Sequence, residues 1–170
     1  MRTTNLALLL ASTKALTTQN VVDILEGAMV GALNAEELPD YAKCVTETGD
    51  AIHQIEDAVA HFEKKTVTDV YEGIQELSIA MRDFANDVKD CGNDDDKHKA
   101  EMIIEMFKKI GANPKNWFIH VGKDILINGV PIWNDLSDAV SQYKTGGYEK
   151  FGEDVGGAIA LALIGQTPNL

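Results

Sequence analysis

The feature that most constrains the fold of this chain is a pattern of apolar residues that occurs twice, 81 positions apart, over Ala51–Met81 and Ile132–Ala162. The tripeptide Asp-Ala-Val occupies matching places in the two copies, at Asp57–Val59 and Asp138–Val140. In each copy, apolar residues spaced by three and four flank a short polar break, which is typical of two helices that bury one face each. The pattern therefore predicts a duplicated helical hairpin.

The length of 170 residues and the apolar content of 45% suit one domain with a core of ordinary size. We expect an all-α, single-domain helical bundle of about six to seven helices, because the repeat predicts two similar halves. The halves span about residues 20–92 and 98–165. The acidic run Asn93–Asp96 indicates a solvated linker over residues 93–97 between them.

Capping residues and breaks set the expected helix boundaries. Asn20 is a good N-cap for a first helix that ends near Leu33, and Pro39 suits the start of a second helix. Residues 125–132 are ambiguous, because their sequence also suits a β-hairpin; we favour helix, since Pro131 would remove a hydrogen bond from the second strand. The other expected helices are Asp40–Lys64, Val67–Cys91, a helix over about 102–110, Ile132–Lys144 and Tyr148–Ile164.

The charge balance excludes two classes of partner. The 27 acidic and 15 basic residues give a formal net charge of −12. A charge of this sign is repelled by nucleic acid and by anionic membrane surfaces, so neither is expected to bind. No apolar stretch approaches the roughly 20 residues that a bilayer requires, and we therefore expect no transmembrane segment.

The N-terminus carries a candidate signal peptide over residues 1–18. Arg2 supplies a positive start, Leu6–Ala11 an apolar run, and Thr13–Ala15 a small-residue cleavage site. The alternative is an amphipathic N-terminal helix, because Lys14 interrupts the apolar character of the segment.

The two cysteines, Cys44 and Cys91, bear on the compartment as well. If the second and third helices form an antiparallel hairpin that turns near Lys65, Cys44 lies opposite about residue 87, roughly one helical turn from Cys91. We therefore expect a disulfide, which an exported protein would retain. The alternative is a pair of buried thiols in a reducing compartment.

The residue pattern predicts no catalytic group, metal site or cofactor. The histidines are His53, His61, His98 and His120, and in Asp50-x-x-His53 and Asp57-x-x-x-His61 a carboxylate lies beside an imidazole on a predicted helix. A di-metal bundle would need further inward glutamates, and the acidic run at 93–96 lacks the spacing of an EF-hand loop.

Several further motifs resemble those of a known group of proteins. They are Cys91-Gly92, Trp117-x-x-x-Val121-Gly122-Lys123, Asn128-Gly129 and Tyr148-x-x-Phe151-Gly152-x-x-x-Gly156. Together with the short leader, they resemble a family of small, secreted helical proteins of ciliated protists that has no assigned activity. The resemblance implies export and a disulfide, and it assigns no functional residue.

These observations favour a non-enzymatic, exported helical protein that acts by interaction or as a structural component of a larger assembly. We expect protein partners or self-association, in the secreted fraction or the lumen of the secretory pathway. The alternative is a binding module for a small apolar ligand or lipid, in a cleft lined by Trp117, Val121, Trp133, Phe151 and Gly156. An enzyme that uses His53, His61 and Asp57 as acid and base is the least supported reading.

Overall fold

The computed structural model describes residues 15–35, 38, 41–45, 48–112 and 131–164, with the side chains of 109–112 and 163–164 excepted. In this part of the chain there are six α-helices, one 3-10 turn and no strand, which confirms the predicted all-α bundle. Among the described helices, none is both long and apolar enough to span a bilayer. The elements are α1 (Thr18–Leu33), η1 (Tyr41–Lys43), α2 (Ala51–Lys64), α3 (Val67–Val88), α4 (Asp94–Ala112), a helix over residues 131–145, and α6 (Tyr148–Ile164).

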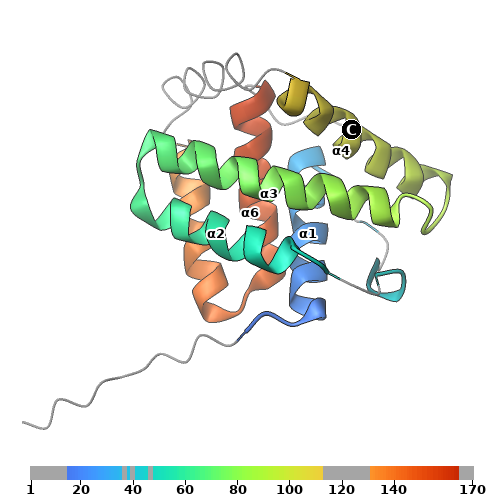
Figure 1. Ribbon diagram of the computed structural model, residues 1–170, viewed down its shortest axis with the longest axis horizontal. Helices are drawn as coiled ribbons and strands as arrows, with labels where there is room; N and C mark the ends of the chain where they lie inside the picture. The colour runs from blue at the N-terminus through green and yellow to red at the C-terminus, as the bar shows by residue number, and fades with distance from the viewer. Residues whose placement is uncertain (1–14, 36–37, 39–40, 46–47, 113–130, 165–170) are drawn as a thin grey trace, which may run out of the picture.

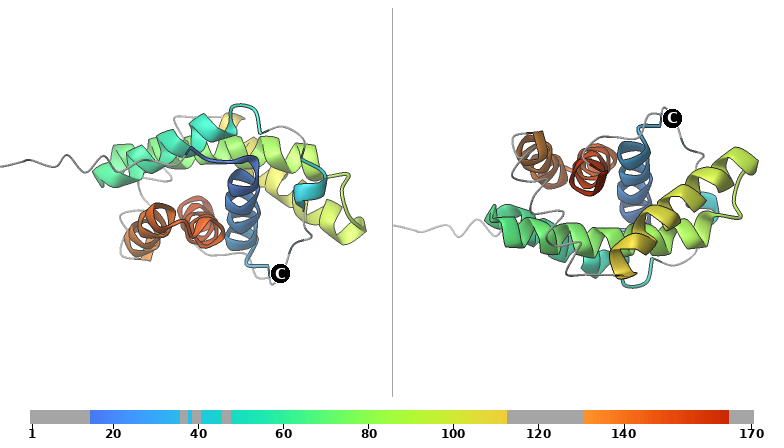
Figure 2. Two further views of the ribbon diagram at one scale, coloured as in Figure 1. Left: turned by 90° about the horizontal axis from the view of Figure 1, so that it is seen from below. Right: turned by 90° about the horizontal axis from the view of Figure 1, so that it is seen from above.

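The helices form two layers that cross each other (Figures 1 and 2). One layer contains α2, α3 and α4, with α3 in contact with both neighbours. The other contains the helix over 131–145, α6 and α1, and α1 packs against α6 more extensively than any other two of the labelled helices pack against each other. Thus α1, the first helix of the first predicted half, lies in the layer formed by the second half. In turn, α4, the first helix of the second half, lies in the layer of α2 and α3. The two halves therefore exchange their first helices. That the halves are duplicated copies stays a prediction.

The core lies between the layers, and the residues of the predicted apolar stripes face it. Ile55, Ala58 and Phe62 of α2 are buried, as are Ile74 and Leu77 of α3. In the second half, the buried residues at matching positions are Leu136, Ala139, Phe151, Val155 and Ala158. The spacing by three and four therefore gave the correct buried face of four helices.

Glycine residues bring α1 and α6 into backbone contact. A Cβ atom added to Gly152 would lie 2.1 Å from the carbonyl oxygen of Ile24, and one added to Gly156 would lie 2.1 Å from that of Ala28. Gly27 of α1 meets the backbone of Glu149 in the same way. Such distances leave no room for a side chain. The side of α6 that carries Gly152 and Gly156, which we call its smooth face, is therefore a helix-packing surface.

The first helix begins three residues earlier than the predicted N-cap at Asn20 implies. Thr17 is its N-cap, and Asn20 occupies the third helical position. The Asn20 amide donates to the Thr17 hydroxyl at 3.2 Å, and the Thr17 amide donates to the Asn20 side-chain oxygen at 3.0 Å. Asn20 therefore closes a reciprocal capping box instead of capping the helix alone.

The predicted helix over Asp40–Lys64 is wrong in its first part. Tyr41–Lys43 forms a single 3-10 turn, and α2 begins only at Ala51. Gly49 adopts a left-handed backbone with φ of 44°, a conformation that an α-helix cannot contain. Hence Gly49, which the predicted helix would have contained, separates the 3-10 turn from α2.

The predicted linker is also largely helical, because Asp94, Asp95 and Asp96 form the first turn of α4. The Asn93 side-chain oxygen accepts from the amides of Asp95 at 2.8 Å and Asp96 at 3.2 Å, which satisfies two free amides of the helix start. Carboxylates are stabilised at this end of a helix by its dipole. The charge run thus helps to start a helix. The segment 113–130, which contains most of the ambiguous residues 125–132, and residues 1–14 of the candidate signal peptide lie outside the described residues.

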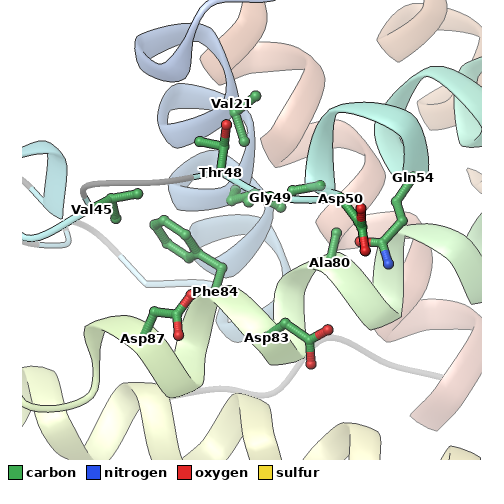
Figure 3. A pocket seen from close by; sticks show the side chains of 12 residues that line it. Val21, Val45, Thr48, Gly49, Asp50, Gln54, Ala80, Asp83, Phe84 and Asp87 are labelled. Carbon is green, nitrogen blue, oxygen red and sulfur yellow. The ribbon is translucent and has the colours of Figure 1, made fainter.

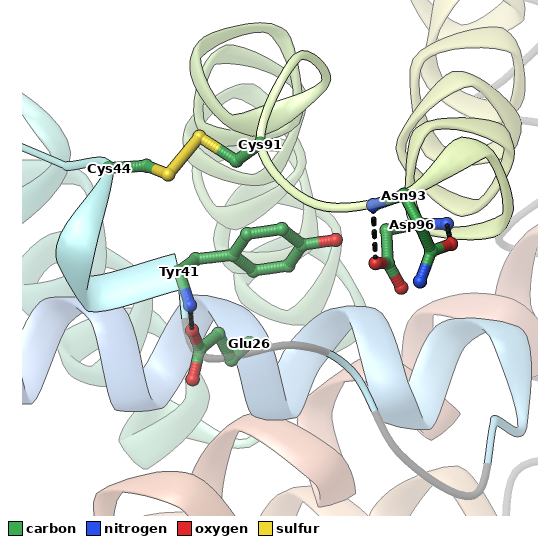
Figure 4. Close-up of a disulfide and its surroundings, with 6 residues drawn as sticks. All are labelled: Glu26, Tyr41, Cys44, Cys91, Asn93 and Asp96. Carbon is green, nitrogen blue, oxygen red and sulfur yellow. Dashed lines mark hydrogen bonds between the residues drawn. A yellow bond between two sulfur atoms is a disulfide. The ribbon is translucent and has the colours of Figure 1, made fainter.

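A disulfide joins Cys44 to Cys91, with their Cα atoms 6.4 Å apart (Figure 4). The predicted pair is therefore present, although Cys44 follows the 3-10 turn and is not part of α2. The bond fixes the segment before α2 to the end of α3.

We expect reduction of the disulfide to lower the unfolding temperature on the order of 10 °C. Opening a link between residues 47 positions apart removes about 4 kcal/mol on the chain-entropy account. For this size of domain, about 1 kcal/mol corresponds to 2–4 °C. Thermal unfolding with and without reductant measures the effect. Two alkylated thiols in the unreduced protein from its natural source would show that the bond is not formed there.

We expect Gly156→Ala to destabilise the protein by at least about 2 kcal/mol, because the new methyl group would clash with backbone that cannot move aside easily. Gly157→Ala is the matched control, since a Cβ there meets nothing within 4 Å. Alanine at that helical position should stabilise by about 0.5–1 kcal/mol. Urea unfolding of both variants tests the contact, and equal effects would contradict it.

Candidate functional site

The described residues of the predicted apolar cleft belong to the core or its edge. Phe151 is fully buried, and Gly156 lies against the α1 backbone. Trp133 packs partly buried at the edge of the core, while Trp117 and Val121 lie outside the described residues. The space beside the smooth face of α6, which could have held a ligand, is therefore occupied by α1.

A different pocket, of about 290 Å³, opens between α1, α3 and the segment that leads into α2 (Figure 3). We call it the α1–α3 pocket. Its floor is apolar, and three carboxylates stand at its rim. The lining residues are Val21, Leu25, Val45, Thr48, Gly49, Asp50, Ala51, Gln54, Ala80, Asp83, Phe84 and Asp87.

Local structure explains why a pocket forms here. The helical structure is interrupted between η1 and α2, where Gly49 takes its left-handed conformation, so none of the described helices covers this side of α1 and α3. Phe84 lies at the base and also packs edge-on against Tyr41, with ring centroids 5.9 Å apart. The disulfide at Cys44 holds the neighbouring segment in place. The pocket is therefore a consequence of the interrupted second helix.

The rim of the α1–α3 pocket is acidic. Asp50, Asp83 and Asp87 are all exposed, and Asp83 accepts two hydrogen bonds from the Arg82 guanidinium, at 3.0 and 2.9 Å. The lining itself contains three carboxylates and no basic side chain. In a protein of net charge −12, this concentration of negative charge favours a cationic group beside an apolar one.

Tyr41 is buried beside the disulfide (Figure 4), and its ring packs against Phe84 of the pocket lining. Its amide donates to the Glu26 carboxylate at 2.6 Å, whereas its hydroxyl has no hydrogen-bond partner among the described residues. Burial raises the pKa of Tyr41 to about 12, and the nearby charges of Asp96 and Glu26 add to the effect. Tyr41 therefore stays protonated well above the pH at which a solvated tyrosine ionises.

The structure also brings together three potential metal ligands at the turn between α2 and α3. The His61 Nδ1 atom lies 3.2 Å from Asp69 Oδ1 and 3.2 Å from Glu72 Oε2. Asp69 further accepts from the Thr66 hydroxyl and pairs with Lys64 at 3.2 Å. The Thr66 hydrogen bond, followed by those of His61 and Lys64, lowers the pKa of Asp69 to about 2.

Sequence reasoning missed this cluster because it sought the partner of His61 on the same helix. Asp57 and His53 are exposed, and the carboxylates beside His61 come from α3. A usable signal existed, since only two residues separate α2 from α3 and Asp69 and Glu72 share one helix face. The α1–α3 pocket had no such signal, because it depends on where the second helix is interrupted.

Comparison with known proteins gives a family match. The sequence model of the SctB-like family, described as Secreted protein B-like, matches residues 10–164. No curated protein and no solved structure matches the chain. The family description names neither an activity nor a source among ciliated protists.

We expect stability to fall at high pH in a way that depends on Tyr41. Below pH 10 the Tyr41 hydroxyl is protonated in both the folded and the unfolded chain. As the pH rises from 10 to about 12, the unfolded chain releases this proton while the folded chain still holds it. The contribution of Tyr41 to the free energy of unfolding is therefore fully present below pH 10 and is lost as the pH rises toward 12. Tyr41→Phe should reduce this loss and cost little at neutral pH, because the hydroxyl has no described partner. Urea unfolding at pH 7 and 11 measures both effects. An unchanged pH dependence in the variant would contradict the assignment.

Proposed function

The chain belongs to the SctB-like family, described as Secreted protein B-like, and we propose that it is an exported, non-enzymatic helical protein that acts by binding another protein. The α1–α3 pocket is the proposed binding site. The observation that carries the proposal is the combination of an apolar floor with an acidic rim in one pocket.

Two observations support a location outside the cytosol. The family is one of secreted proteins. The Cys44–Cys91 disulfide adds to this, because such bonds persist in oxidising compartments and are reduced in the cytosol. The protein would therefore act in the secreted fraction or in the lumen of the secretory pathway.

The lining of the α1–α3 pocket suits binding better than chemistry. Its carboxylates stand at the rim, and it contains no imidazole or thiol to serve as base or nucleophile. The floor offers Val21, Leu25 and Phe84 to an apolar group. A volume of about 290 Å³ accepts one or two side chains of a partner, and it is at the lower end for a complete small-molecule ligand.

Charge determines the kind of partner. A second copy of the chain would bring another net charge of −12 toward an acidic rim, which disfavours self-association at this site. A different protein with an apolar side chain next to lysine or arginine would satisfy both the floor and the rim. The proposed partner is thus a basic, apolar segment of another protein.

A small apolar ligand is the second candidate function, because the same buried floor would take an apolar group without a charge. The two candidates differ in the role of the acidic rim. A protein partner with basic residues needs it, whereas a neutral ligand does not.

A six-residue peptide of alternating lysine and leucine is a direct probe of the proposed site. We expect it to shift the amide NMR signals of residues 48–54 and 83–87, whereas a glutamate–leucine peptide of the same length should not. Asp87→Lys should weaken binding roughly thirtyfold, since it replaces an attraction of about 1 kcal/mol in water by a repulsion of similar size. Glu101→Lys, an exposed change of equal charge on α4, should leave it unchanged.

Equal weakening by Asp87→Lys and Glu101→Lys would contradict the site. Binding of neutral decanol at residues 48–54, with no response to the lysine–leucine peptide, would favour the second candidate over a protein partner. Shifts spread evenly over the molecule for both peptides would contradict both functions.

A further inference from the structure

The cluster of His61, Asp69 and Glu72 lies away from the α1–α3 pocket lining and has a different chemistry. Its three ligand atoms lie within 4.8 Å of one another. We propose that these residues form a binding site for a divalent transition-metal ion, with zinc as its best representative. The proposal does not depend on the proposed function.

The separations between the ligand atoms agree with metal coordination. With metal–ligand bonds of about 2.0–2.2 Å, two ligands at angles between 90° and the tetrahedral value lie about 2.8–3.6 Å apart. Both distances from His61 Nδ1, to Asp69 Oδ1 and to Glu72 Oε2, are 3.2 Å. An ion can therefore sit between the imidazole and either carboxylate with little rearrangement.

The backbone and Thr66 position the ligands. Lys65, in a left-handed conformation with φ of 56°, ends α2 and reverses the chain, so the last turn of α2 faces the start of α3. The Thr66 hydroxyl donates to Asp69 Oδ2 at 2.5 Å and accepts from the Asp69 amide at 3.1 Å. Because Oδ2 is occupied in this way, Oδ1 is the oxygen turned to His61. Outer hydrogen bonds of this kind orient the ligands of known metal sites.

The donor set selects the class of ion. Calcium and magnesium prefer six or more oxygen ligands, whereas an imidazole nitrogen favours zinc and its neighbours in the first transition row. Three protein ligands would leave the remaining coordination position to water or to a group from a partner.

Lys64 gives the proposal its sharpest test. Its ammonium lies 3.2 Å from Asp69 Oδ1, the atom that would bind the ion, and its side chain is 57% exposed. A bound ion must displace this positive charge into solvent, which the exposure allows. Lys64 therefore competes with the metal. If the cluster were only a network of ion pairs, removing Lys64 would not create a stronger site.

The test is isothermal titration of zinc chloride into the full, disulfide-bonded chain after treatment with a chelator. We expect one zinc ion per chain. His61→Gln and Glu72→Gln should each weaken binding at least tenfold. Lys64→Gln should tighten binding roughly tenfold, because it removes repulsion between a single and a double positive charge at close range. His53→Gln, an exposed histidine of α2 outside the cluster, should leave it unchanged.

The unfolding temperature of each metal-free variant shows whether the variant is folded. If His61→Gln is not folded, Glu72→Gln tests the same site. Zinc should raise the unfolding temperature of the unsubstituted chain, because the ion binds the folded state. The proposal fails if that chain does not bind zinc, if His53→Gln weakens binding as much as His61→Gln, or if Lys64→Gln does not tighten it.

Discussion

The backbone contact between α1 and α6 is the interaction on which the rest of the structure depends. It joins the first of the described helices to the last, so α1 and α6 together form one side of the core. The contact is possible because Gly27, Gly31, Gly152 and Gly156 carry no side chain. With α1 held in this way, its other face is free to pack against α3 and the segment around η1. The α1–α3 pocket therefore depends on a contact made on the opposite side of the helix.

The disulfide has a second, more local role. The described residues 41–45 and 48–50 contain one short 3-10 turn and a left-handed glycine, and they have little helical structure to hold them. Cys44 attaches this stretch to Cys91, three residues beyond the end of α3. Tyr41 completes the attachment through its buried ring and through the hydrogen bond that its backbone amide donates to Glu26. The bond that indicates an exported protein thus also shapes the proposed binding site.

Much of the fold could be predicted because helices leave a strong periodic signal. The buried faces of α2 and α3 and the bounds of α6 followed from apolar spacing. Competing local effects were harder to weigh. Gly49 lies inside the helix predicted over Asp40–Lys64 and instead separates two elements. The run of aspartates was predicted to form a linker, but the helix dipole and Asn93 favour the start of α4 there. The sites were not predicted, because both depend on contacts between residues from different elements.

The central claim is that a protein partner binds at the acidic rim of the α1–α3 pocket. Photo-crosslinking in the secreted fraction of the natural source tests it most directly, with a benzophenone amino acid at position 87 and, as a control, at position 101 on α4. We predict a discrete adduct from position 87 alone, joined to a segment of another protein that contains lysine or arginine beside an apolar residue. Equal adducts from both positions, or none from position 87, would contradict the account.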